Sequence, residues 1–422
     1  MNHFEVRKGE LHCEDMPLGR IAEAVGTPAY VYSTATLKRH FHVFREAFEP
    51  REVEVAFAVK ANSNLSVLAT LAALGAGADT VSEGEIRRAL KAGVPASKVI
   101  FSGVGKTARE LAFAIEYGVG QINVESTAEL GLIAQIASDK GARPAIAIRV
   151  NPDVGAGGHA KISTGKAESK FGVSVQEAEV LYAQAAHSGV VAPVGLASHI
   201  GSQITDLGPL EAAYRTLREM AERLRGQGLP LVRLDLGGGL GVPYFNQPEP
   251  PTPADLGAMV NRVFDGLEVG LSVEPGRVIA ANAGVLLSRV IHINTRPDGR
   301  RFVVLDAAMN DLIRPAMYDA YHDIRPVRAA APDAPLLPYD VVGPICETSD
   351  TFTRDRPLPE LKGGDLVAFM TAGAYGAVMA SEYNTRPLAP EVLVNADDFA
   401  VVRPRPSYEQ MLAREPMAPW LR

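Results

Sequence analysis

The chain has 422 residues, which is more than one small domain needs and favours two or three domains. It carries 42 Lys and Arg against 49 Asp and Glu, a formal net charge of −7, and has no block of like charge that could hold nucleic acid or an anionic membrane. The two cysteines lie far apart, so we expect neither a disulfide framework nor a structural zinc site. The first twenty residues are rich in charge and no run approaches about 20 consecutive apolar residues, so we expect a cytoplasmic protein without membrane-spanning segments.

Strand-like apolar runs alternate with segments of helical periodicity between about residues 27 and 276. A helix at about 36–48 comes first. Eight strands follow, predicted at residues 53–59, 78–82, 98–102, 121–124, 145–150, 194–200, 231–236 and 271–274. Amphipathic helices are predicted between them, for example at 65–74, 83–92, 107–117 and 212–225. Eight such units in about 250 residues favour a closed (β/α)8 barrel of the TIM type over an open doubly wound sheet.

The pattern changes after Gly276, where strand-like runs follow one another without regular helices. These runs cover 285–293, 301–305, 339–342, 365–370, 391–394 and 399–402, and a Pro-rich stretch at 325–338 is expected to be a loop. We therefore predict an α/β protein of two domains. Residues 28–276 form the barrel, and residues 277–422, joined by the N-terminal segment 1–27, form a mostly antiparallel β domain.

Polar and charged residues stand where the predicted barrel strands end, at the rim that faces the active site in such barrels. In chain order they are Lys60, Ser82, Ser102, Glu125, Arg149 with Asn151, His199, Gly237 to Gly239, and Glu274. A lysine that ends an apolar strand indicates an amine for covalent chemistry with a carbonyl, and a surface lysine is the alternative for Lys60 taken alone.

The glycine run lets backbone N–H groups approach a phosphate near strands seven and eight, although a tight turn explains the run equally well. His199 could stack on a flat ring, or it could be a hydrogen-bonded residue of the core. Glu274 could form an ion pair at the end of its strand. Together, an amine, a phosphate cradle, a flat histidine and a carboxylate describe a site for pyridoxal 5′-phosphate. A nicotinamide site at residues 237–241 (GGGLG) is disfavoured because the glycine spacing is wrong.

Several segments are similar to those of one family. The segments FAVKAN (57–62), SHIGSQ (198–203), LGGG (236–239) and EPGR (274–277) resemble the barrel-type, fold type III pyridoxal-phosphate decarboxylases, which include ornithine decarboxylase. The resemblance extends to the diaminopimelate decarboxylases through NPDV (151–154), HAKISTG (159–165), KFG (170–172), IRPAMY (313–318), GPICETSD (343–350) and GAYG (373–376). It covers almost the whole chain in the right order. Two mild departures are Thr348, and YNTRP (383–387) in place of a more usual FNGRP, and neither position is expected to carry a chemical role.

This resemblance implies an alanine racemase-like architecture, a homodimer with sites at the interface, and decarboxylation of meso-2,6-diaminopimelate to L-lysine and CO2. It implies that Lys60, His199 and Cys346 are catalytic: Lys60 forms the Schiff base with pyridoxal phosphate, His199 stacks on its ring, and Cys346 is the proton donor. The cofactor would be held by Lys60, His199, Ser202, Gly238, Gly239, Glu274, Gly276, Arg277 and Tyr375. The substrate would be bound by Arg277, Arg314, Tyr318, Glu347 and Tyr375. Asp79 and Glu85 match positions near the lysine, and no metal is implied.

The chemistry of the residues agrees with these roles. A carboxylate such as Glu274 at the pyridine nitrogen keeps that nitrogen protonated, and a thiol such as Cys346 can deliver a proton to one face of a carbon. A free cysteine is more often a small buried hydrophobe, but the polar neighbours of Cys346 argue against an apolar pocket. The loop at 153–172, which is rich in Gly and Lys, is either a solvated face or a lid.

Two alternatives remain from the sequence. The first is a decarboxylase of another basic amino acid, namely ornithine, lysine or carboxynorspermidine, and the second is a non-catalytic relative that binds pyridoxal phosphate. Arg314 beside Glu347 disfavours the first, because an amine-only substrate end has no use for the arginine. The presence of Cys346, Arg314, Tyr318 and Tyr375 disfavours the second.

Overall fold

The computed structural model describes residues 2–155, 164–166, 168–244 and 249–421, and it divides the chain into two compact units. The barrel unit comprises Leu37–Pro243 and Gln247–Ile279, and the β unit comprises Met1–Thr36, Tyr244–Asn246 and Ala280–Arg422. No helix of the described residues is both long and apolar enough to cross a membrane. The observed divisions after Thr36 and Ile279 lie nine and three residues beyond the predicted ones after residues 27 and 276.

The barrel unit contains a closed barrel of eight parallel strands, which confirms the predicted fold class. The strands are β5 (Val53–Ala58), β6 (Gly77–Thr80), β7 (Val99–Phe101), β8 (Gln121–Val124), β9 (Ala145–Arg149), β10 (Ala192–Ala197), β11 (Arg233–Asp235) and β12 (Gly270–Val273). They follow one another around the barrel in chain order, and β12 closes it by pairing with β5. All residues of β6, β7 and β8 are buried, because side chains fill the interior of such a barrel.

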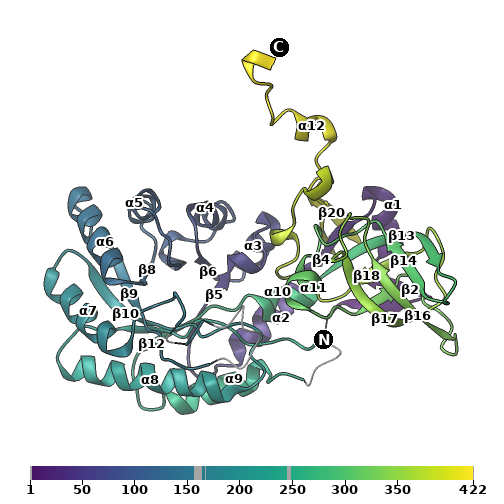
Figure 1. Ribbon diagram of the computed structural model, residues 1–422. Coiled ribbons are helices and arrows are strands. Elements are labelled where there is room, and N and C mark those ends of the chain that lie inside the picture. Colours follow the sequence, from purple (N-terminus) through teal and green to yellow (C-terminus); the bar gives the residue numbers. More distant parts are fainter. Residues whose placement is uncertain (1, 156–163, 167, 245–248, 422) are drawn as a thin grey trace. The chain divides into compact units, whose positions relative to one another are not determined.

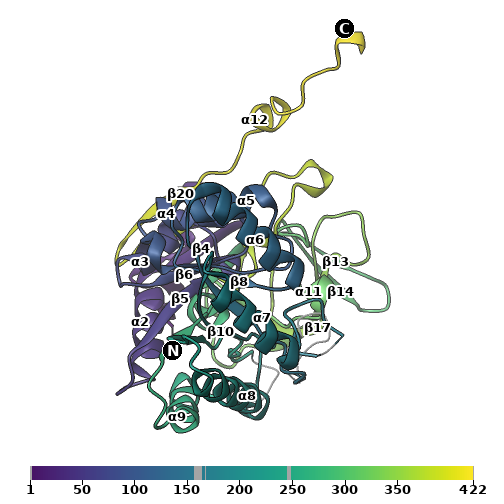
Figure 2. The same ribbon diagram turned by 90° about the vertical axis from the view of Figure 1, so that its left-hand side faces the viewer.

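Helices surround this barrel (Figure 1). They are α2 (Thr34–Glu46), α3 (Leu65–Ala72), α4 (Glu83–Lys91), α5 (Ala108–Glu116), α6 (Thr127–Lys140), α7 (Val175–Ser188), α8 (Leu207–Gly226), α9 (Pro253–Val263) and α10 (Arg277–Ala280). In the turned view, α4, α5, α6 and α7 follow one another around the strands (Figure 2). Several begin at a capping hydroxyl: Ser82 accepts the N–H of Glu85, and Ser126 accepts that of Glu129. Ser82, a strand-end residue in the sequence, therefore starts a helix.

The β unit contains a nine-stranded sheet with the order β17-β16-β14-β13-β4-β19-β20, to which β18 and β15 are added beside β13. Its strands are β4 (Ala29–Ser33), β13 (Gly284–Thr295), β14 (Arg301–Leu305), β15 (Ile324–Pro326), β16 (Leu336–Val342), β17 (Thr351–Pro359), β18 (Leu366–Phe369), β19 (Glu391–Asn395) and β20 (Asp398–Arg403). All pairs are antiparallel except β14 with β16 and β19 with β4. The prediction of a loop at 325–338 is wrong at both ends of that range, since β15 ends at Pro326 and β16 begins at Leu336. Proline is tolerated there because β15 pairs with β18 alone.

The N-terminal segment packs into the core of the β unit. It forms a small sheet of β1 (Phe4–Arg7), β2 (Glu10–Cys13) and β3 (Met16–Pro17), followed by α1 (Leu18–Val25). Buried residues of this segment, including Cys13, share one hydrophobic cluster with Val285 and Leu287 of β13 and Val392 of β19. Two short helices, α11 (Arg314–Tyr318) and α12 (Tyr408–Leu412), complete the unit.

Candidate active site

A cavity of about 300 Å³ lies at the carboxyl ends of the barrel strands. Its lining includes Lys60, Ser102, Asn123, Arg149, Phe171, His199, Asp235 and Glu274, residues that the sequence spreads over more than 200 positions. The volume is at the lower end of the range for small-molecule sites, about 300–1,000 Å³. The barrel therefore brings Lys60, His199 and Glu274, three of the predicted site residues, into one enclosure.

Lys60 lies in a short 3₁₀ turn, Val59–Ala61, directly after β5. Its Nζ is 2.6 Å from Oδ2 of Asp79, whose side chain is completely buried on β6. Glu85, at the start of α4, accepts the N–H of Val81 at 2.8 Å, and burial followed by the charge of Asp79 raises the pKa of Glu85 to about 7. The structure thus places Asp79 against the lysine, where it can hold the amine in position.

Glu274 directly follows β12 and forms a buried acid pair with Asp235 of β11. The two carboxyl groups share a hydrogen bond, and burial, followed by the negative charges of Asp235 and Asp79, raises the pKa of Glu274 well above its usual value. No donor in the described part of the chain bonds to Oε1 of Glu274. A buried acceptor without a hydrogen-bond donor is suited to a cationic N–H group supplied by a ligand.

Asp235 is held by hydrogen bonds inside the barrel. Its Oδ1 accepts the N–H of Gly237 at 3.0 Å, and its Oδ2 is 3.2 Å from Nε2 of Gln121 and 3.4 Å from Nδ2 of Asn123. Asp235 was not among the site residues predicted from the sequence. Its signal was a carboxylate within the apolar strand at 231–236, where a buried charge requires partners.

His199 follows β10, and its ring orientation is set by the glycine loop. The N–H of Gly238 donates to Nδ1 of His199 at 3.1 Å, so Nδ1 is an acceptor and a neutral ring carries its proton on Nε2. Burial, followed by the positive charges of Lys60 and Arg149, lowers the pKa of His199 well below its usual value. The ring is therefore neutral and flat in the cavity, as stacking on an aromatic ligand requires.

Three loops meet beside His199 without room for side chains on their glycines. A Cβ on Gly238 would lie 2.2 Å from the carbonyl oxygen of Glu274, and a Cβ on Gly239, whose φ is +120°, would lie 2.5 Å from that of Gly201. Next to them, Nη2 of Arg277, which begins α10, donates to Oγ of Ser202 at 3.1 Å. The predicted cofactor residues of β10, β11 and β12 are thus gathered at one rim, with Gly276 directly before Arg277.

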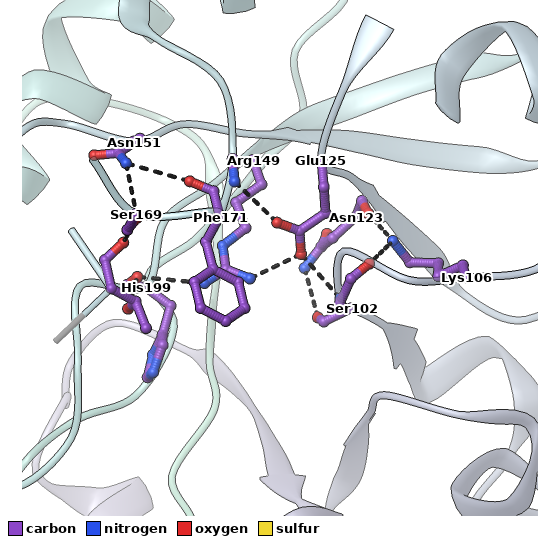
Figure 3. A network of polar contacts seen from close by, with 12 residues as sticks. Ser102, Lys106, Asn123, Glu125, Arg149, Asn151, Ser169, Phe171 and His199 are labelled. Atoms are coloured by element: carbon purple, nitrogen blue, oxygen red, sulfur yellow. Dashed lines mark hydrogen bonds and ion pairs between the residues drawn. The ribbon is translucent and has the colours of Figure 1, made fainter. Parts of the chain in front are cut away.

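A second buried network, which was not predicted as a network, lies beside the cavity and joins its lining through Ser102, Asn123 and Arg149 (Figure 3). Lys106 donates to the carbonyls of Gly103 and Asn123 and to Oε1 of Glu129 at 2.6 to 2.8 Å. Glu125 accepts from the N–H of Gly103 at 2.9 Å and from Nη1 of Arg149 at 2.8 Å. Two cations and two carboxylates therefore balance one another among largely buried side chains.

This network also anchors the chain near residues 164–172. Oε2 of Glu125 accepts the N–H of Gly172 at 3.0 Å, and Cζ of Arg149 lies 4.8 Å from the ring centroid of Phe171. Asn151 donates to the carbonyls of Lys166 and Phe171. Part of the loop predicted as a lid or a solvated face, residues 156–163 with Lys161 and also residue 167, lies outside the described residues. Whether it moves stays a prediction.

In the β unit, the predicted substrate residues Arg314 and Tyr318 contact each other at the two ends of α11. Arg314 is buried, its Cζ lies 5.8 Å from the ring centroid of Tyr318 and 5.9 Å from that of Tyr244, and its Nη2 is 3.4 Å from the hydroxyl of Tyr244. Tyr244 was not selected from the sequence. The two aromatic faces hold the guanidinium, which is a planar donor suited to a carboxylate.

Cys346 and Glu347 lie on an exposed loop between β16 and β17. Oε2 of Glu347 accepts from Oγ of Ser349 at 2.8 Å, and its Oε1 accepts from the hydroxyl of Tyr383. These two bonds, that from Tyr383 first, lower the pKa of Glu347. Tyr383, which was given no chemical role, therefore holds a predicted substrate residue.

Tyr375, the remaining predicted residue, has a left-handed backbone with φ of +54°. A large aromatic residue rarely adopts this conformation, and such strain is common at functional sites. The glycines on either side of Ala374 and Tyr375 pack too closely for a side chain: a Cβ on Gly373 would lie 2.1 Å from the carbonyl oxygen of Ala280, and one on Gly376 would lie 2.6 Å from that of Ala372. The turn therefore presents Tyr375 in one fixed direction.

Comparison with known proteins agrees with this geometry. Residues 34–281 match the family model described as pyridoxal-dependent decarboxylase, pyridoxal binding domain. The chain is 48% identical over 422 residues to a protein of Zymomonas mobilis subsp. mobilis named diaminopimelate decarboxylase, and the match covers 99% of each chain. The crystal structure of diaminopimelate decarboxylase from Helicobacter pylori complexed with L-lysine is 41% identical, with a TM-score of 0.90 over 94% of this chain and 98% of that one. A second lysine complex, from M. jannaschii, is 36% identical, with a TM-score of 0.94 over 100% of both chains.

These likenesses extend over the barrel unit and the β unit alike, at identities well above those that indicate a shared fold alone. The chain belongs to the family of pyridoxal-dependent decarboxylases that includes the diaminopimelate decarboxylases.

Proposed function

We propose that this protein is a pyridoxal-phosphate-dependent diaminopimelate decarboxylase, which converts meso-2,6-diaminopimelate to L-lysine and CO2, the last step of lysine biosynthesis. The observation that carries the proposal is the cavity in which the amine of Lys60 and the buried acid pair of Glu274 line one enclosure. Full-length relatives with the same barrel and β unit bear that name.

The residues of the barrel fit the cofactor. Glu274 has an unfilled buried acceptor suited to a protonated ring nitrogen, and Lys60 offers an amine to an aldehyde. Ser202, Gly238, Gly239, Gly276 and Arg277 are gathered at the rim where a phosphate is expected. Bound pyridoxal phosphate supplies an electron sink for the electrons left when a carboxylate departs as CO2.

The protein's own residues would orient the substrate and move one proton. Oε1 of Glu274 would accept the N–H of the ring nitrogen, and the neutral ring of His199 would cover one face of a flat ligand. Sγ of Cys346 would hold the proton that is delivered to the carbon that loses CO2. Tyr375, from its strained turn, would contact the cofactor and the substrate.

Substrate choice is assigned to the far end of the molecule. Arg314, with Arg277 and Tyr318, would bind the distal carboxylate in a charge-assisted hydrogen bond, while Glu347 takes the distal ammonium. Lysine or ornithine offers no carboxylate at that end, so the buried guanidinium of Arg314 would lose the partner for which its aromatic enclosure is built. This favours diaminopimelate over the other basic amino acids.

The test is product formation by the purified chain with pyridoxal phosphate. Meso-diaminopimelate should give equal amounts of CO2 and L-lysine, measured by mass spectrometry, whereas lysine, ornithine and carboxynorspermidine should react far more slowly. Equal turnover of lysine or ornithine would contradict the assignment of the substrate.

We further propose that the active unit is a homodimer with shared sites. Cys346 and Glu347 are exposed within the β unit, so residues outside that unit must complete their site. We assign those residues to the barrel of a second copy. Inactive Lys60→Ala and inactive Cys346→Ala should regain activity when their subunits are exchanged, because one intact site forms per mixed dimer. No activity after mass spectrometry has confirmed exchange would contradict shared sites. The cytoplasmic location expected from the sequence stays a prediction.

A further inference from the structure

The loop that carries Cys346 and Glu347 is closed by one buried carboxylate, that of Asp350. Asp350 is only 3% exposed, and its Oδ2 accepts the N–H of Ile345, directly before Cys346, at 2.7 Å. Backbone bonds of 3.1 Å join the N–H of Gly343 to the carbonyl of Asp350, and the N–H of Asp350 to the carbonyl of Glu347. Asp350 is thus the buried residue that fixes this loop, and side chains of Asn384 and Tyr383 contact its exposed part.

The other oxygen of Asp350 reaches a second segment. Its Oδ1 accepts the N–H of Met309 at 2.7 Å. The segment around Met309 is closed in the same manner, because Oδ2 of Asp311 accepts the N–H of Ala308 at 2.9 Å, and it continues directly into α11 and Arg314. One carboxylate thus joins the loop of Cys346 to the segment that leads to Arg314.

The close packing around Asp350 leaves it little freedom. A Cβ on Gly343 would lie 2.4 Å from Oδ2 and 2.6 Å from Oδ1, so a side chain at residue 343 would displace the carboxylate. Both oxygens act as acceptors for backbone N–H groups, a pattern that an amide side chain cannot reproduce because its NH2 would face an N–H. The arrangement requires a carboxylate at this residue.

We propose that Asp350 is a positioning residue for decarboxylation, which holds Cys346 and Glu347 at a fixed distance from Arg314. It acts through these residues and is not assigned a contact with substrate or cofactor. Because a thiol must lie within hydrogen-bond reach of the carbon that it protonates, a small shift of the loop should slow the proton transfer. The inference rests on the proposed function and adds to it a residue outside the predicted site.

The experiment compares Asp350→Asn with Asp397→Asn, an exposed aspartate in the turn between β19 and β20. We expect Asp350→Asn to lower kcat for meso-diaminopimelate by about 10- to 100-fold, as for the loss of a hydrogen bond to a charged group. The affinity for pyridoxal phosphate and its visible absorption should stay unchanged, because the barrel residues are intact. Asp397→Asn should retain full activity.

A double-mutant cycle with Cys346→Ser separates positioning from general damage. If Asp350 acts through Cys346, Asp350→Asn should lower kcat by less than about 3-fold in the Cys346→Ser background. An equal loss in both backgrounds, or an Asp350→Asn variant that is as active as the Asp397→Asn control, would overturn the inference. Where Asp350→Asn does not fold, Gly343→Ala, which pushes on the carboxylate without removing it, should give the same pattern. A wild-type protein that releases no CO2 from diaminopimelate overturns the proposed function as well, whereas an active wild type with an unaffected Asp350→Asn overturns only this inference.

Discussion

In the barrel unit the candidate residues follow the ends of strands, and Lys60, His199 and Glu274 line one cavity, whereas in the β unit the candidate residues lie on loops and a five-residue helix. The barrel residues are held by side-chain pairs: Lys60 by its ion pair with Asp79, Arg149 by its ion pair with Glu125, and Glu274 by the acid pair with Asp235. In the β unit, the loop of Cys346 is held by a buried carboxylate that binds backbone N–H groups. The residues at the strand ends are thus fixed through their side chains, whereas the loop of Cys346 is fixed through its backbone.

The comparison leads to an expected order of effects. Changes in the barrel should affect the cofactor and the chemistry, because charges in a buried cavity are coupled strongly. Changes at Arg314 or in the loop of Cys346 in the β unit should affect the binding of the substrate and the proton transfer, and they should leave the bound cofactor intact. The four predictions below test this division.

The largest effect is expected for Lys60→Ala. The visible absorption of lysine-bound pyridoxal phosphate should vanish, and turnover should fall by roughly 10⁴-fold or more because covalent catalysis is lost. Loss of the amine also leaves the buried carboxylate of Asp79 without its ion pair, so Tm should fall. Lys60→Ala/Asp79→Asn should restore Tm but not the absorption band, while Lys91→Ala, an exposed lysine on α4, is the control. Retention of both the band and full turnover in Lys60→Ala would show that another residue binds the cofactor.

Arg314→Met should produce the next largest effect, and it should change selectivity. We expect kcat/KM for meso-diaminopimelate to fall by roughly 10²- to 10⁴-fold, while the much lower value for lysine changes little, because only the first substrate offers a distal carboxylate. Arg300→Met, an exposed arginine before β14, is the matched control. Measuring kcat/KM for both substrates in each variant decides the matter, and equal losses for the two would contradict the assignment of Arg314.

Asp235→Asn should weaken the chemistry of the barrel without removing the lysine. The substitution removes the negative charge beside Glu274 and one of the acceptors for Gln121, Asn123 and Gly237, so Glu274 is oriented less well. We expect roughly 10- to 100-fold lower kcat and weaker binding of pyridoxal phosphate. Asp265→Asn, which is exposed after α9, should behave as wild type. Unchanged cofactor affinity and kcat in Asp235→Asn would contradict a role for the acid pair.

Much of this organisation could be predicted from local pattern, and the missing parts depend on contacts between distant segments. The strands of the barrel and the end positions of Lys60 and Glu274 follow from apolar runs and their polar ends. The run AYVYS at 29–33 lies in the β sheet between β13 and β19 rather than with the barrel, and its partner strands begin more than 250 residues later. Similarly, the contact of Asp235 with Gln121 joins residues 114 positions apart, so it exists only once the barrel closes. Periodicity carries no information about such pairings.

Tyr383→Phe is expected to give the smallest effect, and it tests the β unit most finely. The hydroxyl of Tyr383 donates to Glu347 and is the first cause of the lowered pKa of that carboxylate. Phenylalanine removes the donor, so the pKa of Glu347 should rise toward its ordinary value, and Glu347 should become protonated at a higher pH than in the wild type. We expect KM for meso-diaminopimelate to increase by about 2- to 5-fold, with kcat nearly unchanged, because this exposed contact orients a binding group and takes no part in proton transfer. The increase in KM as pH falls should begin at a higher pH than in the wild type, and Tyr408→Phe, an exposed tyrosine on α12, is the control. A loss confined to kcat would instead place Tyr383 with Cys346 in the proton transfer, and the assignment of Tyr383 to substrate binding would be wrong.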